Sequence, residues 1–492
     1  MSHGTPDDVR TTGTAMDLLQ LSDTRLGATV VTCNDEFFGA AANLLRHDPP
    51  MRRPGVFTDH GQWVDGWETR RRREPGYDWC VVRLGVPGRV RRIAVDTTHF
   101  VGNQPEAFWV GACGDPAPAE DASWFEVVGR TPLRPDARHE VDVSSPSRVT
   151  FLRLCIDPDG GVARFRVWGD AVPSPGDMGG EHGTGLVDLA DSRVGAIVED
   201  RSDAHFSTAA HVLLPGPPLS MGDGWETRRR RGPGHDWMVV RLAARGVPVD
   251  IEVDTTFFKG NAPATCWVEG KDGDAGPWRT LVAETPVRPH SPQWFTTGET
   301  APVTHLRLSI APDGGVARFR VRGRLDPEGA ERLGMAWLDT LPDAVAERIL
   351  LQVCGSPRWA REMAARRPFG TLAFLREAAH VVWRGLAPED WREAFAAHPR
   401  IGEHNAGARA RREQAGTADA GAEVLTELAE GNRTYEARFG HVFLIRATGR
   451  SADEILASLR QRLGNDADTE LSIAAAQQEE ITDLRLRQAV GM

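Results

Sequence analysis

Two arginine-rich segments carry the side chains best suited to binding a small anion. The sequence DGWETRRRREPGYDW at residues 65–79 returns as DGWETRRRRGPGHDW at residues 223–237. Guanidinium groups present planar, paired donors that fit carboxylate oxygens. In an extended backbone, Arg70 and Arg72 would share one face, and Arg71 and Arg73 the other. One face could then form structural ion pairs while the other binds an anion.

Groups that could transfer protons accompany these arginines. They lie in the duplicated segment and in a second repeated motif, VDTTHFVGN at 95–103 and VDTTFFKGN at 253–261. The candidates in the first copy are Asp65, Glu68, Arg70, Arg72, Asp78, Asp96, His99 and Asn103. Those in the second copy are Asp223, Glu226, Arg228, Arg230, His235, Asp236, Asp254, Lys259 and Asn261.

Many of these positions also have a structural explanation. The Asp of VDTT can hold a turn, and the Asn of GN can adopt a left-handed conformation. The two copies are not chemically equivalent, because His99 corresponds to Phe257 and Tyr77 to His235. One copy alone, or the interface between the copies, could therefore be active. Asp, Glu and His would permit a metal site, but no tight ligand spacing demands one, and we predict none.

A second kind of candidate lies in FAAHPRIGEHNAGARARREQAG at residues 395–416. His398 precedes Pro399, and the residue before a proline avoids the helical region, so the pair is expected to end a helix. A histidine at such an end is placed for contact with a ligand. A lone histidine is more often structural or solvated, and the assignment rests on the motifs that accompany it.

The elements that must position these residues belong to a chain of 492 residues, enough for about three domains. Lys and Arg number 58 and Asp and Glu 69, a net charge of −11 that argues against nucleic-acid binding through the arginine runs. The six cysteines form no CxxC pair. No secretory signal or membrane span is visible. We expect a cytoplasmic protein with no membrane partner.

Self-comparison predicts two tandem all-β domains. DPDGGVARFRVWG at 157–169 returns as APDGGVARFRVRG at 311–323. Short β-branched runs bounded by Gly, Pro or Asp indicate jelly-roll-like sandwiches. After Pro327, helical spacing and N-cap residues predict an all-α domain. The expected divisions are a disordered tail at 1–15, repeats at 16–172 and 185–325, linkers at 173–184 and 326–334, and a helical domain at 335–492.

The duplicated motifs DGWETRRRR, G-(H/Y)-D-W and VDTTxFxGN resemble allantoicase over about 16–325. The resemblance implies two jelly-roll-like domains and hydrolysis of allantoate to ureidoglycolate and urea. Arginines would hold the carboxylate of allantoate, and carboxylates with a histidine would transfer protons to the leaving urea.

The helical part resembles 2-oxo-4-hydroxy-4-carboxy-5-ureidoimidazoline (OHCU) decarboxylase over about 335–490. RPF (367–369), HPRIGE (398–403), EQAG (413–416), NRTYEARFGHVFLIRATGRS (432–451), RLGND (462–466) and LRL (484–486) occur in order. The resemblance implies catalysis by His398 and Glu413, and substrate binding by Pro399, Gln414, Phe443, Ile445 and Arg485. The chain departs from the family in reading HPRIGE for HPDLAG, and Ala410 stands where a serine is common.

The decarboxylation that the resemblance implies needs an acceptor for the electrons left by CO₂. The ring imine of the substrate can accept them, so we predict no cofactor. The leading interpretation is a bifunctional enzyme acting on small ureido substrates, allantoate and OHCU. One alternative makes the sandwiches a non-catalytic ligand-binding or oligomerisation scaffold for the decarboxylase. Two tandem sandwiches with exposed strand edges also make a homo-oligomer expected.

Overall fold

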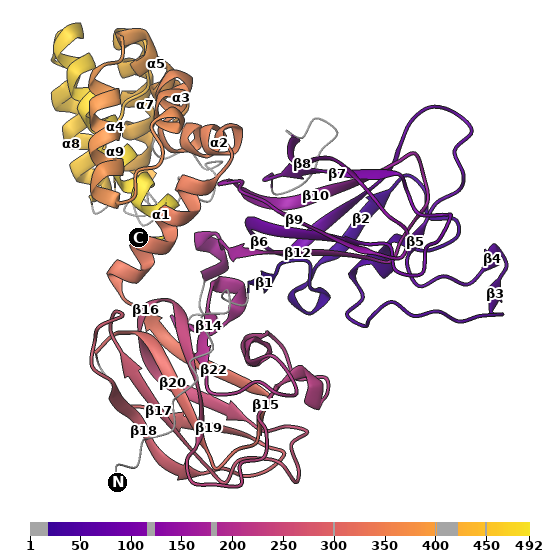
Figure 1. The fold of residues 1–492 in the computed structure, drawn as a ribbon. Helices are drawn as coiled ribbons and strands as arrows, with labels where there is room; N and C mark the ends of the chain where they lie inside the picture. Colours follow the sequence, from indigo (N-terminus) through magenta and orange to yellow (C-terminus); the bar gives the residue numbers. More distant parts are fainter. Residues whose placement is uncertain are drawn as a thin grey trace, which may run out of the picture. The chain divides into compact units, whose positions relative to one another are not determined.

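The structure, a computed structural model, describes residues 18–115, 124–178, 185–298, 301–398, 400, 422–447 and 450–492. The tail predicted at 1–15 lies outside these residues. The chain forms two compact units, residues 1–333 and 334–492. The first unit holds two β-rich domains and the second consists of helices, which confirms the predicted fold class (Figure 1).

The first β domain is organised around one long strand, β6, which pairs with different neighbours along its length. Near its start β6 pairs with β2 and β10, and near its end with β9 and β12. The sheet order is β1-β12-β6-β10-β7-β8. The strands are β1 (Leu19–Gln20), β2 (Thr29–Cys33), β3 (Phe57–Thr58), β4 (Gly61–Gln62), β5 (Trp67–Glu68), β6 (Asp78–Asp96), β7 (Ala107–Cys113), β8 (Phe125–Pro132), β9 (Arg138–Asp142), β10 (Arg148–Asp157), β11 (Gly161–Val162) and β12 (Arg164–Ala171).

The second β domain repeats this plan, with sheet order β13-β22-β16-β20-β17-β18 and with β14 and β19 paired to the long strand β16. Alternate side chains of β16 are buried, as expected for a strand that lines a core with one face. The strands are β13 (Val187–Asp188), β14 (Ile197–Arg201), β15 (Trp225–Glu226), β16 (Asp236–Asp254), β17 (Thr265–Lys271), β18 (Arg279–Pro286), β19 (Pro292–Thr296), β20 (Val303–Ala311), β21 (Gly315–Val316) and β22 (Arg318–Leu325).

The repeated motifs anchor the loops at one end of each sandwich. Trp67 is fully buried and donates its indole N–H to the Asp35 carbonyl at 2.7 Å, and Trp225 does the same to Asp203 at 2.8 Å. The Gly161 position admits no side chain, because a Cβ there would lie 2.0 Å from the Phe100 ring. The motif DGGV therefore brings β11 against β5, which carries Glu68.

The helical unit is built from α1 (Pro327–Thr340), which begins in the first unit, α2 (Asp343–Cys354), α3 (Pro357–Ala365), α4 (Leu372–Arg384), α5 (Pro388–Ala396), α7 (Ala422–Phe439), α8 (Ala452–Arg462) and α9 (Ala467–Ala489). The sequence signals for helix starts hold. Ser356, Thr371, Ser451 and Asp466 each accept a backbone N–H as N-caps. One face of α9 packs into the core beside α2 and α4.

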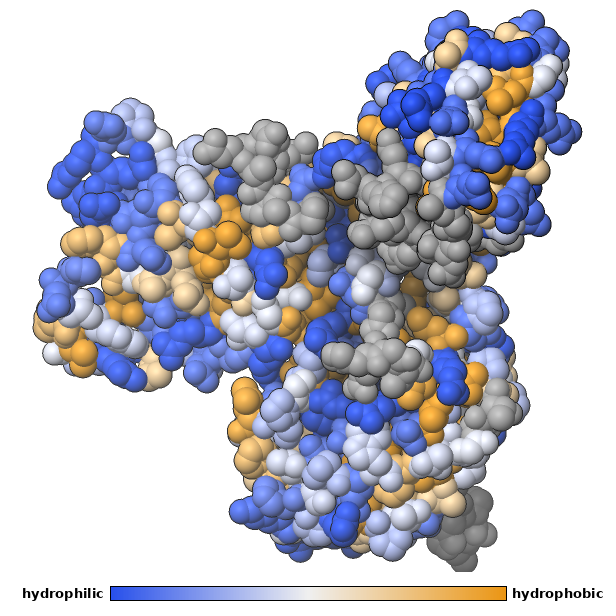
Figure 2. Space-filling view, turned by 180° about the vertical axis from the view of Figure 1, so that it is seen from behind, coloured by the Kyte–Doolittle hydropathy of each residue, from blue (hydrophilic) through white to orange (hydrophobic). Residues whose placement is uncertain are grey.

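Polar residues cover much of the face seen in Figure 2, with apolar residues in small groups between them. Such scattered apolar residues are ordinary on a protein surface. Across the part of the chain that the structure describes, no helix has both the length and the hydropathy needed to span a bilayer.

Candidate functional site

The arginine segments are attached to their sandwiches by carboxylates. Arg70 Nε lies 3.0 Å from Asp35 Oδ2, and Arg72 Nη1 lies 2.7 Å from Asp78 Oδ1. The Arg72 backbone N–H donates to Asp159 at 2.8 Å. Arg70 and Arg72, both proposed to bind substrate, thus form the structural ion pairs expected of one arginine face.

The second segment is attached at equivalent points, except that Arg228 Nε donates to His205 Nδ1 at 2.9 Å. The backbone N–H of Arg228 donates to Asp203 at 2.6 Å, and Arg230 forms an ion pair with Asp236. Arg70 and Arg228 remain exposed despite these contacts, as do Arg71, Arg73, Arg229 and Arg231, whereas Arg72 and Arg230 are partly buried.

A glutamate and an asparagine from different motifs meet in each repeat. Asn103 Nδ2 donates to Glu68 Oε1 at 2.8 Å, and Asn261 Nδ2 donates to Glu226 Oε1 at 2.7 Å. All four residues are candidates from the sequence, but nothing in the sequence pairs them. Burial raises the pKa of Glu68, although the hydrogen bond from Asn103 opposes the shift. A carboxyl group of this kind can donate a proton nearer neutral pH than an ordinary glutamate.

The pair lies beside exposed aromatic rings. The backbone N–H of Phe38 donates to the Glu68 carbonyl, and that of Phe206 donates to the Glu226 carbonyl. Phe206 is 63% exposed, and Phe37 stacks on His60 with ring centroids 4.3 Å apart. The same end of each sandwich therefore presents a carboxyl group, an amide and an aromatic surface.

Asp65 and Asp223 have buried arginine partners that sequence analysis did not name. Arg164 Nη2 lies 2.8 Å from Asp65 Oδ2, with side chains 2% and 1% exposed. Arg318 Nη2 lies 2.6 Å from Asp223 Oδ2 in the second repeat. Burial alone would raise the pKa of Asp65, but its hydrogen bond with Arg164 lowers it. These two aspartates hold the loops of each repeat together.

The remaining candidates lie in turns and at the surface. Asp96 accepts the Thr98 N–H at 2.8 Å, and Asp254 accepts the Thr256 N–H at 2.8 Å, so both hold turns. Of the residues other than glycine in this motif, His99 is the one with a left-handed conformation, with φ of 71°, and Phe257 matches it with φ of 73°.

His235 and Lys259, the two remaining candidates of the second repeat, lie outside the turn that Asp254 holds. His235 packs against Trp267 with ring centroids 4.6 Å apart. Lys259 is exposed.

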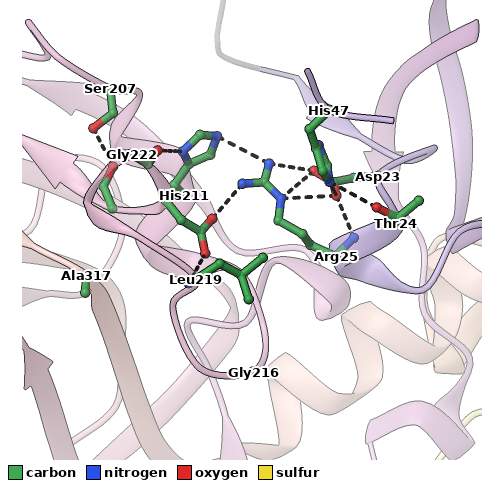
Figure 3. A network of polar contacts seen from close by, with 12 residues as sticks. Asp23, Thr24, Arg25, His47, Ser207, His211, Gly216, Leu219, Gly222 and Ala317 are labelled. Carbon is green, nitrogen blue, oxygen red and sulfur yellow. Dashed lines mark hydrogen bonds and ion pairs between the residues drawn. The ribbon is translucent and has the colours of Figure 1, made fainter. Parts of the chain in front are cut away.

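A polar network joins the two repeats (Figure 3). Arg25 of the first repeat donates Nη1 to Asp223 Oδ1 of the second at 2.6 Å and pairs through Nη2 with Asp23 at 2.7 Å. His47 Nε2 lies 3.1 Å from Asp23 Oδ1, and His211 Nε2 lies 3.4 Å from Arg25 Nη2. Burial and the charge of Arg25 lower the pKa of His211, which favours the neutral ring.

A cavity of about 510 Å³ lies on the second repeat, over the outer side of β16, β19 and β22. Arg320 Nε lies 3.1 Å from Glu252 Oε2, and Arg322 stacks on Trp294 at 4.2 Å. None of these residues is among the candidates from the sequence. No cluster of three or more His, Cys, Asp or Glu that could hold a metal occurs among the residues that the structure describes.

In the helical unit, His398 follows α5, and its N–H donates to the Phe395 carbonyl at 3.0 Å. The His398 ring is half-buried, with Nε2 shielded from solvent. Arg485 on α9 is buried and donates to the Val353 carbonyl at 3.4 Å. Pro399, Glu413 and Gln414 lie outside the described residues, as does Ala410.

Phe443 and Ile445 are buried on either side of Leu444, whose carbonyl is held by a buried ionic cluster. Arg462 donates Nη1 to this carbonyl at 2.6 Å and Nη2 to Glu470 Oε1 at 2.6 Å. Two other side chains complete the cluster. The hydroxyl of Tyr435 also donates to Glu470, and Asn465 Nδ2 donates to it at 2.7 Å.

A separate cavity of about 520 Å³ lies between α4 and α9. Its wall includes the ion pairs of Arg376 with Asp483 and of His380 with Glu479. Neither His398 nor Arg485 lines it.

Comparison with known proteins matches each unit to a family. The allantoicase repeat model matches residues 19–172 and 187–326, more than half of the chain. The chain belongs to the allantoicase family. A probable allantoicase of Burkholderia mallei is 42% identical over 322 residues, covering 63% of this chain and 95% of that protein. The crystal structure of allantoicase from Saccharomyces cerevisiae is 35% identical, covers 63% of this chain and 93% of its own, and superposes with a TM-score of 0.55.

The OHCU decarboxylase family model matches residues 339–487, in the helical unit. A crystal structure of OHCU decarboxylase in the presence of (S)-allantoin is 35% identical over 31% of this chain and 99% of its own, with a TM-score of 0.28. The chain is therefore a fusion of allantoicase repeats with an OHCU decarboxylase domain, as both resemblances predicted.

Residues that sequence analysis missed had a visible signal in the allantoicase repeats. Arg164 and Arg318 are the first arginine of the repeated ARFRV motif, and a repeated charge inside an apolar strand indicates a buried partner. The contact of Arg25 with Asp223 had no such signal, because it is made once, between the repeats, and is not duplicated within each repeat.

Loss of the Arg25 side chain should loosen the junction between the allantoicase repeats. Hydrogen bonds to charged groups contribute about 1.5–3 kcal/mol, so we expect Arg25→Ala to speed amide hydrogen exchange at Ala209–Leu213 about 10- to 100-fold. The equivalent change Arg193→Ala should leave exchange there unchanged. Equal protection in Arg25→Ala and the unaltered protein would contradict this.

Acid should also loosen the junction between the allantoicase repeats. Burial would raise the pKa of Asp23, but hydrogen bonds from His47 and Arg25 lower it well below its usual range. Burial would also raise the pKa of Asp223, but Arg318 and Arg25 lower it. The stabilisation of the junction by the ionised Asp23 and Asp223 is therefore complete above the ordinary aspartate pKa of about 3.9. It is lost as pH falls toward the lowered pKa values.

Proposed function

We propose that the allantoicase repeats hydrolyse allantoate to ureidoglycolate and urea, and that the helical domain decarboxylates OHCU to (S)-allantoin. The observation that supports the first reaction best is the Glu–Asn pair, repeated at the same end of both sandwiches beside exposed arginines and aromatic rings. The six free cysteines fit the reducing conditions of the cytoplasm, where we place both reactions.

Hydrolysis of allantoate breaks one bond between the central carbon and a ureido nitrogen. The departing nitrogen must gain a proton to leave as urea, while the oxygen of water bonds to the central carbon and loses a proton. We assign the proton donation to the protonated carboxyl of Glu68 or Glu226. The amide of Asn103 or Asn261 would orient that carboxyl, and the exposed arginines would attract the substrate carboxylate.

The remaining allantoicase candidates receive supporting roles in this proposal. Asp65 and Asp223, through their buried arginines, would hold the loops that carry Glu68 and Glu226. Arg70, Arg72, Arg228 and Arg230 would fix the segments from which their exposed neighbours point. Asp96 and Asp254 would shape the turns that lead to Asn103 and Asn261.

Replacement of Glu68 with Gln tests the proton donor. General acid catalysis contributes about 10²–10⁴-fold, so we expect a loss of that order in kcat for urea release from allantoate, either in Glu68→Gln or in Glu226→Gln. The variant that loses activity identifies the active repeat. Glu74→Gln is the matched control, since Glu74 is exposed in the same segment.

The pH profile gives a second readout of the same assignment. If Glu68 donates the proton, kcat falls as pH rises through its raised pKa, because the carboxyl loses its proton there. Asn103→Ala removes a hydrogen bond that favours the charged form, so this alkaline limb should move to higher pH. Urea release by the double Glu68→Gln, Glu226→Gln variant at the unaltered rate would refute the site. Absence of release by the unaltered protein would refute the function.

For the helical domain we propose that decarboxylation proceeds without an added cofactor. The bond between the ring carbon and the carboxylate breaks, its electron pair moves into the conjugated ring imine, and a proton is then added on one face. His398 and Glu413 would hold the substrate hydroxyl and transfer protons. Arg485, Gln414, Pro399 and the backbone at Phe443 and Ile445 would fix the ring.

The two proposed reactions are not consecutive. Decarboxylation yields a closed ring, whereas allantoate is an open chain, so a separate ring-opening hydrolysis must take place between them. Fusion of the two domains then secures equal amounts of two enzymes rather than transfer of an intermediate from one to the other.

A further inference from the structure

The first allantoicase repeat carries a hairpin in a place where the second has only a short connection. Between the motifs LLRHDPP and DGWE the first repeat has residues 51–64, whereas between LLPGPP and DGWE the second has residues 219–222. The longer connection contains the strand pair β3 and β4. This pair stands at the end of the first sandwich that also carries β5, the strand of Glu68 (Figure 1).

The tip of the hairpin lies on two aromatic residues of the candidate site. The His60 ring stacks on Phe37 with ring centroids 4.3 Å apart. A Cβ at Gly61 would lie 3.7 Å from the Phe38 ring, so the backbone of the tip packs against this ring. Phe38 is 36% exposed, whereas its equivalent Phe206 is 63% exposed. The hairpin therefore covers part of a surface that is open in the second repeat.

Hydrogen bonds fix the orientation of His60. Its backbone N–H donates to Thr58 Oγ1 at 3.2 Å, at the turn between β3 and β4. Its Nδ1 lies 2.9 Å from the Phe37 carbonyl oxygen, which can only accept, so Nδ1 carries the hydrogen. In the neutral ring Nε2 is then an acceptor. The exposed His60 side chain thus presents an acceptor whose direction is set before a ligand binds.

The second repeat has a histidine in the place of Phe37, and that histidine already has a partner. Arg228 Nε donates to His205 Nδ1 at 2.9 Å. In the first repeat the equivalent arginine, Arg70, is bound instead to Asp35 at 3.0 Å. The ring nitrogen that accepts a hydrogen bond in the second repeat is therefore paired with an arginine of the same segment.

The difference between His99 and Phe257 at equivalent positions has a structural reason. His99 Nε2 lies 3.2 Å from the Pro50 carbonyl oxygen, directly before the connection that forms the hairpin. Phe257 stands at this position in the second repeat, where the connection is short. His99 belongs to the motif that ends at Asn103, the partner of Glu68. The hairpin is therefore attached on both sides of the Glu–Asn pair.

A ureido group fits the surface that the hairpin completes. It is planar, so it can lie against an aromatic ring, and its N–H groups donate hydrogen bonds. His60 Nε2 supplies an acceptor for such an N–H. The Glu–Asn pair adjoins the same aromatic residues, since the Phe38 N–H donates to the Glu68 carbonyl at 3.2 Å. One small substrate can therefore contact the imidazole and the carboxyl group together.

We infer that the first repeat is the one that cleaves allantoate, and that His60 binds the ureido group that departs as urea. His60 Nε2 accepts an N–H of this group and holds its other nitrogen beside the carboxyl of Glu68, which donates the proton. Both assignments depend on the proposed hydrolysis of allantoate. They add to it the repeat that reacts and the residue that binds the leaving group.

The change His60→Phe tests this role, because phenylalanine keeps a ring over Phe37 and removes the acceptor. A hydrogen bond between uncharged groups changes binding about 2- to 10-fold, so we expect KM for allantoate to rise by that factor with kcat nearly unchanged. His60→Gln should recover part of the loss, since its amide oxygen can accept the same N–H. His205→Phe is the matched control in the second repeat and should keep the KM of the unaltered protein.

Exchange of the whole connection gives a larger effect. Residues 51–64 are replaced with the sequence of residues 219–222. The contact of the first residue is kept, because the N–H groups of Met51 and Leu219 each donate to the aspartate of the DGWE motif, at 2.9 Å and 3.0 Å. We expect kcat/KM for urea release to fall at least about 10-fold, since both the acceptor and the cover are lost. Circular dichroism spectra show whether the exchanged protein keeps its fold.

The outcomes distinguish failure of the hairpin assignment from failure of the proposed function. Absence of urea release from allantoate by the unaltered protein would refute the function itself. Urea release by the unaltered protein, with an unchanged KM in His60→Phe, would refute the role of His60 and leave the function standing. Loss of activity in Glu226→Gln but not in Glu68→Gln would refute the choice of the first repeat.

Discussion

Replacing His398 with alanine should lower kcat for CO₂ release from OHCU about 10²–10⁴-fold, the usual contribution of a positioned proton-transfer group. The ring stands at the end of α5 with Nε2 shielded from solvent. Water is therefore poorly placed to replace it. The variant should release urea from allantoate at the unaltered rate, because His398 belongs to the helical unit.

His380→Ala serves as the control for the His398 experiment. His380 lines the cavity between α4 and α9, where it pairs with Glu479, and we expect its loss to leave decarboxylation within a few-fold of normal. The opposite outcome, with His380→Ala inactive and His398→Ala active, would move the site to that cavity. Stopped-flow measurement of substrate loss reports on both variants.

Removing Arg164 should be the most damaging single change to the first sandwich. Arg164→Met leaves the Asp65 carboxylate buried with its main partner gone, and breaking a buried pair in this way costs about 3–5 kcal/mol. The midpoint temperature for unfolding of the first sandwich should fall by at least about 6 °C, as measured by calorimetry or circular dichroism. Arg318→Met should have a matching effect on the second sandwich.

Two comparisons separate this structural role from a catalytic one. Arg71→Met removes an exposed arginine of the first repeat and should leave the unfolding temperature of the first sandwich unchanged. The double change Arg164→Met, Asp65→Leu removes both charges and should recover part of the lost stability. A stable but inactive Arg164→Met protein would show instead that the pair belongs to the chemistry.

The sequence predicted the fold because its local signals are strong and agree with one another. Alternating apolar residues mark β6 and β16, and the repeated motifs mark the loops that follow them. Ser356 and Ser451 mark helix starts, since a serine at the N-cap satisfies a backbone donor that the helix leaves free. These signals act over a few residues, so they can be read without knowing the tertiary structure.

The partners of the charged residues could not be predicted in the same way. Asp65 and Arg164 lie on different strands, and the contact between them depends on how loops fold over the sandwich end. Arg70 and Arg72 were predicted to share one face and were named as candidates for substrate binding, and both form ion pairs, but the pattern could not tell a face that forms ion pairs from one that binds substrate. Both faces carry the same residue type.

In the helical domain, the ordered motifs named His398 and Arg485, but they did not reveal the cluster around Glu470. Helical periodicity treats Glu470 and Arg462 as surface residues, because charged side chains are seldom fully buried. Only the packing of α7, α8 and α9 shows that both are enclosed.

The cluster around Glu470 has a consequence for the proposed binding of substrate by the backbone at Phe443 and Ile445. Because Arg462 ties down the Leu444 carbonyl, the peptide groups of the neighbouring residues are rigid before any ligand arrives. The entropy of ordering that segment is spent during folding and not during binding. If the backbone at Phe443 and Ile445 binds the substrate as proposed, it would need little adjustment when the ligand arrives.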